Sequence, residues 1–145
     1  MNSIELLPSD FKEKLKLHYA KAIKAGHPSR ADDYEHEFFD FNFDLVSNPE
    51  ATFYGRVEGD TMIEVGIHHG DIAVIDKSLD PQDGDLIVAY VNNEFVIKFL
   101  DLTHLKDGYI ELQPANRKYK PIRIYDVKNF EVWGVVVWTI TNWRK

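Results

Sequence analysis

A series of short apolar runs, separated by turn-forming residues, fills the chain from Ala51 onward and constrains the fold most. Glycine, aspartate and asparagine divide the runs, and Asn92-Asn93 can adopt the positive φ angles of a tight hairpin turn. Short strands at this spacing are typical of an antiparallel β sheet or barrel-like β domain. The sequence therefore predicts a mostly β, antiparallel domain. The expected strands cover residues 52–57, 72–76, 86–91, 94–100, 109–113, 121–124 and 132–141.

Residues 1–28 lack this β pattern and form an expected N-terminal arm to a domain of residues 29–145. Apolar residues recur at every fourth position from Phe11 to Ile23, which favours one face of an amphipathic helix. The arm therefore either docks on the domain as a partly helical segment or detaches toward a partner. Residues 29–50 carry alternating aromatic residues that suit either a strand or turns, and we leave their structure open.

Composition excludes several classes of function. The 145 residues carry a formal net charge of −7, which argues against a large nucleic-acid surface. The absence of cysteine excludes disulfides, thiol catalysis and cysteine-based metal sites. The histidines show no ligand spacing, so we expect neither a metal nor a cofactor. No secretory signal or membrane-spanning run is evident, so we expect a cytoplasmic protein that does not bind membranes.

One lysine stands out among the expected strands. In the run Phe95–Leu100, strand alternation places Lys98 on the same face as Val96 and Leu100. A lysine there protects an exposed edge strand from aggregation, which is the simpler interpretation. If the face is covered, however, burial lowers the pKa of the ammonium, and a neutral amine can take a proton from a hydroxyl. Lys98 is therefore either a surface residue or a candidate general base.

A hydroxyl on a glycine turn is the matching candidate nucleophile. Thr61 follows Gly59-Asp60, and a glycine at that place permits a sharp bend that projects the next side chains. The backbone N–H groups of Asp60 and Thr61 could then form an oxyanion hole. On its own, Gly-Asp-Thr is an ordinary turn, so its significance depends on whether Thr61 meets Lys98.

Several ordered motifs together resemble the LexA/UmuD family of self-cleaving peptidases, and the UmuD branch most. The motifs are Val-Glu-Gly-Asp-Thr-Met-Ile at 57–63, Gly-Asp at 70–71, Asp-Gly-Asp at 83–85, Lys98, Leu-Gln-Pro-Ala-Asn at 112–116 with Tyr119, Pro121 and Ile122, Val-Trp-Gly-Val-Val at 132–136, and Ala-Gly-His-Pro-Ser at 25–29 with Ala31 to Tyr34.

This resemblance implies a β peptidase domain that cuts its own arm between Ala25 and Gly26. Thr61 would occupy the nucleophile position and Lys98 that of the general base. The resemblance also implies stimulation by a RecA–single-stranded-DNA filament during the SOS response to DNA damage. A homodimer of the trimmed chain would then act as an accessory subunit of an error-prone translesion polymerase. An arm of about 25 residues is too short for a DNA-reading helix-turn-helix domain, so we expect no sequence-specific DNA binding.

The chain departs from the family at the nucleophile, where the family has serine and this sequence has Thr61. The β-branch stiffens χ1 and adds a methyl group beside the attacking oxygen. A misplacement of about 1 Å can cost on the order of a hundredfold in rate. Thr61 is therefore a slow native nucleophile, a natural loss of cleavage, or a deliberate substitution. The alternative function is a non-cleaving dimeric interaction subunit with a relict site.

Overall fold

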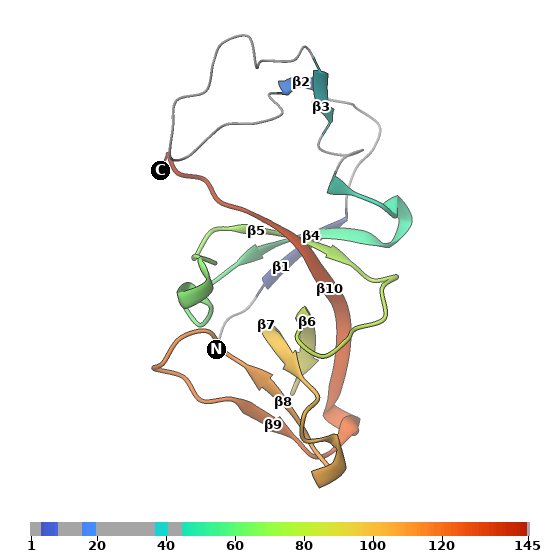
Figure 1. Ribbon diagram of the computed structural model, residues 1–145, viewed down its shortest axis with the longest axis vertical. Helices are drawn as coiled ribbons and strands as arrows, with labels where there is room; N and C mark the ends of the chain where they lie inside the picture. The colour runs from blue at the N-terminus through green and yellow to red at the C-terminus, as the bar shows by residue number, and fades with distance from the viewer. Residues whose placement is uncertain (1–3, 9–15, 20–36, 41–44, 145) are drawn as a thin grey trace.

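The computed structural model describes residues 4–8, 16–19, 37–40 and 45–144, with only the backbone pairing of the first three segments (Figure 1). Eight strands form one sheet in the order β1-β4-β5-β10-β6-β7-β8-β9, and every neighbouring pair is antiparallel. This architecture confirms the mostly β fold class. The strands of the sheet are β1 (Ile4–Pro8), β4 (Thr52–Val57), β5 (Ile72–Asp76), β6 (Leu86–Val91), β7 (Glu94–Asp101), β8 (Ile110–Gln113), β9 (Ile122–Ile124) and β10 (Phe130–Ile140).

Short 3₁₀ helices occupy several of the connections. They are η2 (Pro49–Ala51), η3 (Ile63–Val65), η4 (Leu105–Asp107) and η5 (Val127–Asn129). The turn between β6 and β7 contains Asn92 and Asn93 at φ angles of 48° and 68°, so the predicted tight hairpin is confirmed. No helix of the described residues has the length and apolar character needed to cross a bilayer.

Strand β10 joins two halves of the sheet, one formed by β1, β4 and β5 and the other by β6 to β9. Its first part pairs with β6 and its last part with β5, and Val135 lies opposite residues of both strands. Register shifts on either side of Val135 bend the strand between its two partners, as Figure 1 shows. Gly134 fits this crossing because a Cβ atom there would lie 2.6 Å from Ile75 Cγ2.

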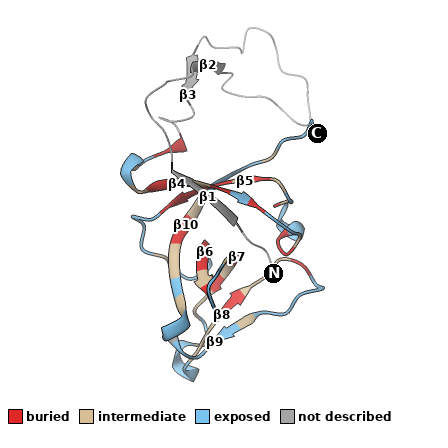
Figure 2. Ribbon diagram, turned by 180° about the vertical axis from the view of Figure 1, so that it is seen from behind, coloured by how far each residue is buried: buried red, intermediate tan, exposed pale blue. Residues whose placement is uncertain are grey.

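Two apolar clusters cover opposite faces of β6 and β7. The first joins Val88 and Ile97 to Ile75 of β5, and the second joins Ile87 and Val96 to neighbouring residues. Figure 2 shows buried residues along β5, β6 and β7, with exposed residues in the loops. Strands that are covered on both faces have nearly continuous apolar sequences, which explains the runs at 86–91 and 94–100.

The described part of the arm is extended. Ile4–Pro8 forms β1 and pairs with β4, while Lys16–Tyr19 forms β2 and pairs with β3 (Glu37–Asp40). The helix predicted from Phe11 to Ile23 is therefore wrong over residues 16–19, and the rest of that range lies outside the described residues. A spacing of four residues places side chains on one side of a strand as well as of a helix, so the pattern could not separate them.

Candidate active site

The loop between β4 and β5, residues 58–71, holds Thr61 and is called here the nucleophile loop. Its base is closed by two backbone hydrogen bonds, in which Gly70 N–H donates to Val57 O and Val57 N–H donates to Asp71 O, both at 2.8 Å. Gly59 has a φ of 89°, a conformation that favours glycine over residues with a side chain. The bend at Gly59 turns Thr61 inward, and Thr61 is only 2% exposed.

Lys98 reaches Thr61 from the middle of β7. Lys98 Nζ lies 2.8 Å from Thr61 Oγ1, to which it donates a hydrogen bond, and it also donates to Ile97 O at 3.2 Å. Lys98 is 3% exposed, so this contact is buried. The structure thus brings together the two side chains that the sequence singled out, although their catalytic roles stay predictions.

The edge-strand interpretation of Lys98 is wrong. β7 lies between β6 and β8, and Lys98 itself pairs with Ile87 of β6. Pairing with β8 covers Phe99 to Asp101 and thus begins just beyond Lys98. The lysine side chain is covered by the nucleophile loop rather than by water, because Thr61 packs against it.

Burial controls the charge of this lysine. Desolvation lowers the pKa of Lys98 from 10.5 to about 8, because the ammonium form is disfavoured away from water. Within residues 45–144, no ion pair involves Lys98, so no carboxylate restores the charged form. A substantial neutral fraction is therefore present at slightly alkaline pH, and a neutral amine can accept the hydroxyl proton of Thr61.

A second loop, residues 114–119, holds the nucleophile loop from outside and is called here the clamp loop. Ala115 N–H donates to Thr61 O at 2.8 Å. Asn116 Nδ2 donates to Asp60 O at 2.9 Å, and the Tyr119 hydroxyl donates to Asp60 Oδ1 at 2.7 Å. The Pro-x-Asn-x-x-Tyr motif stands out in the sequence only for its resemblance to the family. The sequence did not predict the contacts of Asn116 and Tyr119 with Asp60, because the partners lie more than fifty residues apart.

The backbone N–H groups of Asp60 and Thr61 are the predicted oxyanion donors, and this role stays a prediction. Within residues 45–144, the backbone N–H groups of Asp60 and Thr61 donate to no acceptor, whereas their carbonyl oxygens are held by Asn116 and Ala115. Unpaired donors on a fixed turn are what an oxyanion requires. The predicted cleavage residues, Ala25 and Gly26, lie outside the described residues.

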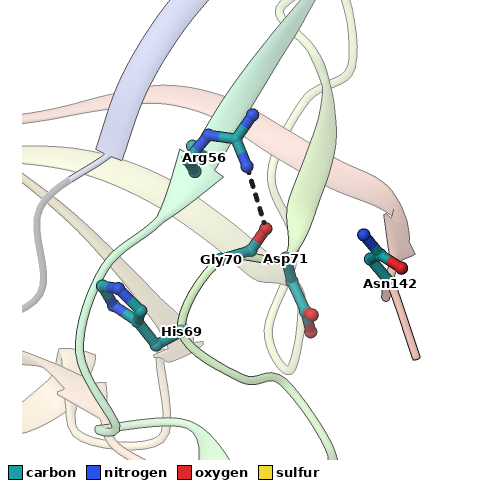
Figure 3. A pocket seen from close by; sticks show the side chains of 5 residues that line it. All are labelled: Arg56, His69, Gly70, Asp71 and Asn142. Atoms are coloured by element: carbon teal, nitrogen blue, oxygen red, sulfur yellow. Dashed lines mark hydrogen bonds between the residues drawn. The ribbon is translucent and has the colours of Figure 1, made fainter. Parts of the chain in front are cut away.

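A shallow cavity of about 300 Å³ opens beside the nucleophile loop (Figure 3). Arg56, His69, Gly70, Asp71 and Asn142 line it, and Arg56 Nη1 donates to Gly70 O at 3.3 Å. His69 Nδ1 also accepts a hydrogen bond from Gly59 N–H at 3.0 Å, within the nucleophile loop. No sequence pattern predicted this contact, because the adjacent histidines indicated only that their side chains point in opposite directions on a strand.

A separate charged cluster lies at the far end of β7 and β8, and is called here the Glu111 cluster. Asp101, His104 and Glu111 have potential ligand atoms within 4.8 Å of one another. His104 Nε2 lies 3.1 Å from Glu111 Oε1, and Arg123 Nε lies 3.7 Å from Glu111 Oε2. Histidine spacing did not indicate this group, because strand register rather than sequence proximity places Asp101 opposite Glu111.

Comparison with known proteins adds a family and several relatives. A family model described as Peptidase S24-like matches residues 18–137. The chain is 36% identical to protein SamA of Salmonella typhimurium over 118 residues, and 38% identical to protein MucA of Escherichia coli over 120 residues; each alignment covers 81% of this chain and 79% of the relative. It is also 35% identical over 127 residues to the LexA repressor of Clostridium botulinum, covering 87% of this chain but only 62% of the repressor.

Proposed function

The chain belongs to the peptidase S24-like family, and on that premise we propose that it is a self-cleaving peptidase with a hydroxyl/lysine dyad. The observation that carries the proposal is the buried contact of 2.8 Å between Lys98 Nζ and Thr61 Oγ1. The lowered pKa of Lys98 supports it, because a base that operates near neutral pH must lose its proton there.

In the proposed first step, neutral Lys98 takes the proton of the Thr61 hydroxyl. Thr61 Oγ1 attacks the carbonyl carbon of Ala25 and forms a tetrahedral intermediate. The N–H groups of Asp60 and Thr61 hold the negative oxygen, and such donors are worth roughly 3–4 kcal/mol each in other peptidases. The clamp loop keeps these donors in position through its bonds to Asp60 and Thr61.

In the second step, the Lys98 ammonium gives its proton to the nitrogen of Gly26, and the bond between Ala25 and Gly26 breaks. An ester then joins Ala25 to Thr61. Neutral Lys98 takes a proton from water, the resulting hydroxide attacks the ester, and Thr61 recovers its hydroxyl. The released arm of residues 1–25 carries the new carboxyl end.

We further propose that Thr61 occupies the position of a family serine and slows cleavage. Thr61 is almost fully enclosed, so its methyl group has little freedom to move away from the path of the attacking oxygen. A small displacement of the oxygen from the carbonyl carbon is costly in rate.

The biological role that we propose is that of a UmuD-like mutagenesis protein in the SOS response to DNA damage. A RecA–single-stranded-DNA filament would favour the arm conformation in which the 25–26 bond is extended and docked, which is a population shift rather than new chemistry. The trimmed chain would act in the cytoplasm as a homodimer and an accessory subunit of an error-prone translesion polymerase. The net charge of −7 is consistent with binding to proteins on DNA rather than to DNA itself.

The second candidate is a non-cleaving dimeric interaction subunit that retains a relict site. The β-branched side chain at position 61 favours it, because the hydroxyl–amine contact would then persist without efficient attack. The two candidates share the fold and differ only in whether chain length changes with time.

Three full-length chains separate the candidates: the parent, Thr61→Ser, and Thr61→Ser with Lys98→Ala. Each is incubated at about pH 9, and the products are followed by gel and intact mass. We expect Thr61→Ser to release a fragment of residues 1–25, the parent to do so at least about tenfold more slowly, and the Lys98→Ala chain not to cleave. An uncut Thr61→Ser chain would favour the interaction subunit, and equal cleavage without Lys98 would contradict the dyad.

A further inference from the structure

A histidine acceptor links the two limbs of the nucleophile loop. Gly59 N–H, two residues before Thr61, donates to His69 Nδ1 at 3.0 Å. The bonds from the clamp loop instead tie Asp60 and Thr61 to a different segment of the chain. The His69 contact thus connects the limb before Thr61 to the limb returning to β5.

The acceptor role requires a particular protonation state. Nδ1 accepts a hydrogen bond only when it carries no proton, so the neutral ring must hold its proton on Nε2. Protonation of the ring converts Nδ1 into a donor, and Gly59 N–H then faces another N–H.

We propose that His69 is a positioning residue that holds the bend at Gly59 and so aligns Thr61 with Lys98. The inference rests on the proposed peptidase function and concerns the geometry of the same site. Without the Nδ1 acceptor, the loop retains only its base and the clamp loop contacts.

Charged groups lie near the contact between His69 and Gly59. Arg56 of β4 and Asp71 at the start of β5 line the cavity with His69 (Figure 3). Glu58 and Asp60 flank Gly59 in the chain. The backbone N–H of His68 donates to the carboxylate of Asp71 at 2.8 Å. The His69 ring instead accepts from the backbone N–H of Gly59.

The test of alignment uses cleavage rates of full-length Thr61→Ser chains at about pH 9, where Lys98 is largely neutral. Adding His69→Asn, whose amide oxygen can replace Nδ1 as the acceptor, should retain the rate within about twofold. Rescue by this conservative variant separates the acceptor role from mere packing of the ring.

Two further variants complete the series. His69→Ala should cleave about threefold to tenfold more slowly, because the loop loses one hydrogen bond. His68→Asn is the matched control, because His68 is also a histidine of this loop but does not accept from Gly59; it should keep the rate. An unchanged rate in His69→Ala, or a loss in His69→Asn as large as that in His69→Ala, would overturn the proposal.

A measurement that needs no cleavage keeps this inference separate from the proposed function. In the parent chain labelled with ¹⁵N, we expect a scalar coupling between Gly59 N and His69 Nδ1 at about pH 8, because the hydrogen bond joins these two nitrogens. The same coupling should be absent in His69→Ala and present in His68→Asn. If no Thr61→Ser chain cleaves, the peptidase proposal fails, and this coupling alone decides whether His69 holds the bend; its absence at about pH 8 overturns the inference.

Discussion

Two buried charged side chains lie on neighbouring strands, Lys98 on β7 and Glu111 on β8, and their surroundings differ sharply. Glu111, with a side chain 8% exposed, is flanked by His104 at 3.1 Å and by Arg123 at 3.7 Å. Lys98, at 3% exposed, contacts a hydroxyl and a carbonyl oxygen, and within residues 45–144 no ion pair includes it.

This difference separates a structural charge from a reactive one. Burial of a charge is costly unless an opposite charge offsets the lost hydration, and the Arg123 guanidinium does so for Glu111. Lys98 has no such neighbour, and its pKa falls to about 8 instead. A buried amine without an oppositely charged neighbour contributes little to stability and is a good general base. The candidate site is therefore recognisable by a buried lysine that has no ion-pair partner among residues 45–144.

The largest effect should come from keeping a positive charge at position 98 while preventing its loss. In a Thr61→Ser chain, Lys98→Arg should reduce cleavage by about 10²–10⁴-fold, because a guanidinium does not deprotonate in this pH range. Quantitative gels of fragment release measure the rate. Glu111→Gln is the control and should leave the rate nearly unchanged. A loss of cleavage in both chains would contradict the assignment of a reactive role to Lys98 and a structural role to Glu111.

The next largest effect concerns stability. Lys98→Met should raise the free energy of unfolding by about 1–3 kcal/mol at neutral pH, because the folded parent must bury an ammonium or give up its proton. The pKa of Lys98 is lower in the folded chain than its ordinary value of 10.5, so the unfolded state binds more protons between about pH 8 and 10.5. Stability of the parent therefore rises with pH across that window, and the advantage of Lys98→Met shrinks.

Urea titrations of both chains at about pH 7 and about pH 10.5 give this comparison. The matched control is Lys77→Met, which changes a lysine that lies over the Trp133 ring rather than in the dyad. An advantage for Lys98→Met that does not change with pH would show that packing, rather than the buried charge, determines its stability.

A smaller effect of opposite sign is expected at the compensated charge. Glu111→Gln should lower the free energy of unfolding by about 1–2 kcal/mol, since His104 and Arg123 lose their shared partner but remain partly exposed to water. Thermal unfolding followed by circular dichroism at neutral pH measures this loss. A stabilising effect of Glu111→Gln would indicate that the contacts with His104 and Arg123 do not offset the burial of Glu111.

The smallest effect should come from an exposed ion pair. Arg117 Nε lies 3.9 Å from Glu64 Oε2, and the Arg117 side chain is 95% exposed. Arg117→Ala should leave the unfolding midpoint unchanged within experimental error, because solvent screens such a pair. Arg117 N–H also donates to Glu64 Oε2 at 2.8 Å, and this backbone bond survives the substitution. A clear loss of stability would mean that surface charges hold the clamp loop.

The strands of the domain were predictable because their physical signals are local. Apolar runs bounded by glycine, aspartate and asparagine predicted residues 52–57, 72–76 and 86–91, which are β4, β5 and β6 with those bounds. The arm was less predictable because every-fourth spacing fits a strand as well as a helix. Residues 16–19 pair with residues 37–40, and a pairing across such a distance leaves no local trace in the sequence.

The candidate site was predictable only in part. Alternation placed Lys98 among apolar neighbours. Whether β7 is an edge strand or an internal strand depends on the position of β8, and sequence periodicity does not predict the order of strands in a sheet. The motif resemblance rather than any spacing rule linked Lys98 to Thr61. The contacts of Tyr119 with Asp60 and of His69 with Gly59 depend on loop geometry, for which the sequence offers glycine positions but no partners.

The position of β10 has a consequence for chain synthesis. Thr61 comes from the half of the sheet that contains β4 and β5, Lys98 comes from the half that contains β6 to β9, and β10 is the strand that hydrogen-bonds to both halves. Residues 130–140 emerge from the ribosome after both halves. The strand that the two halves share is therefore the last of the sheet to be synthesised, so the complete sheet that supports Thr61 and Lys98 forms only late in chain synthesis.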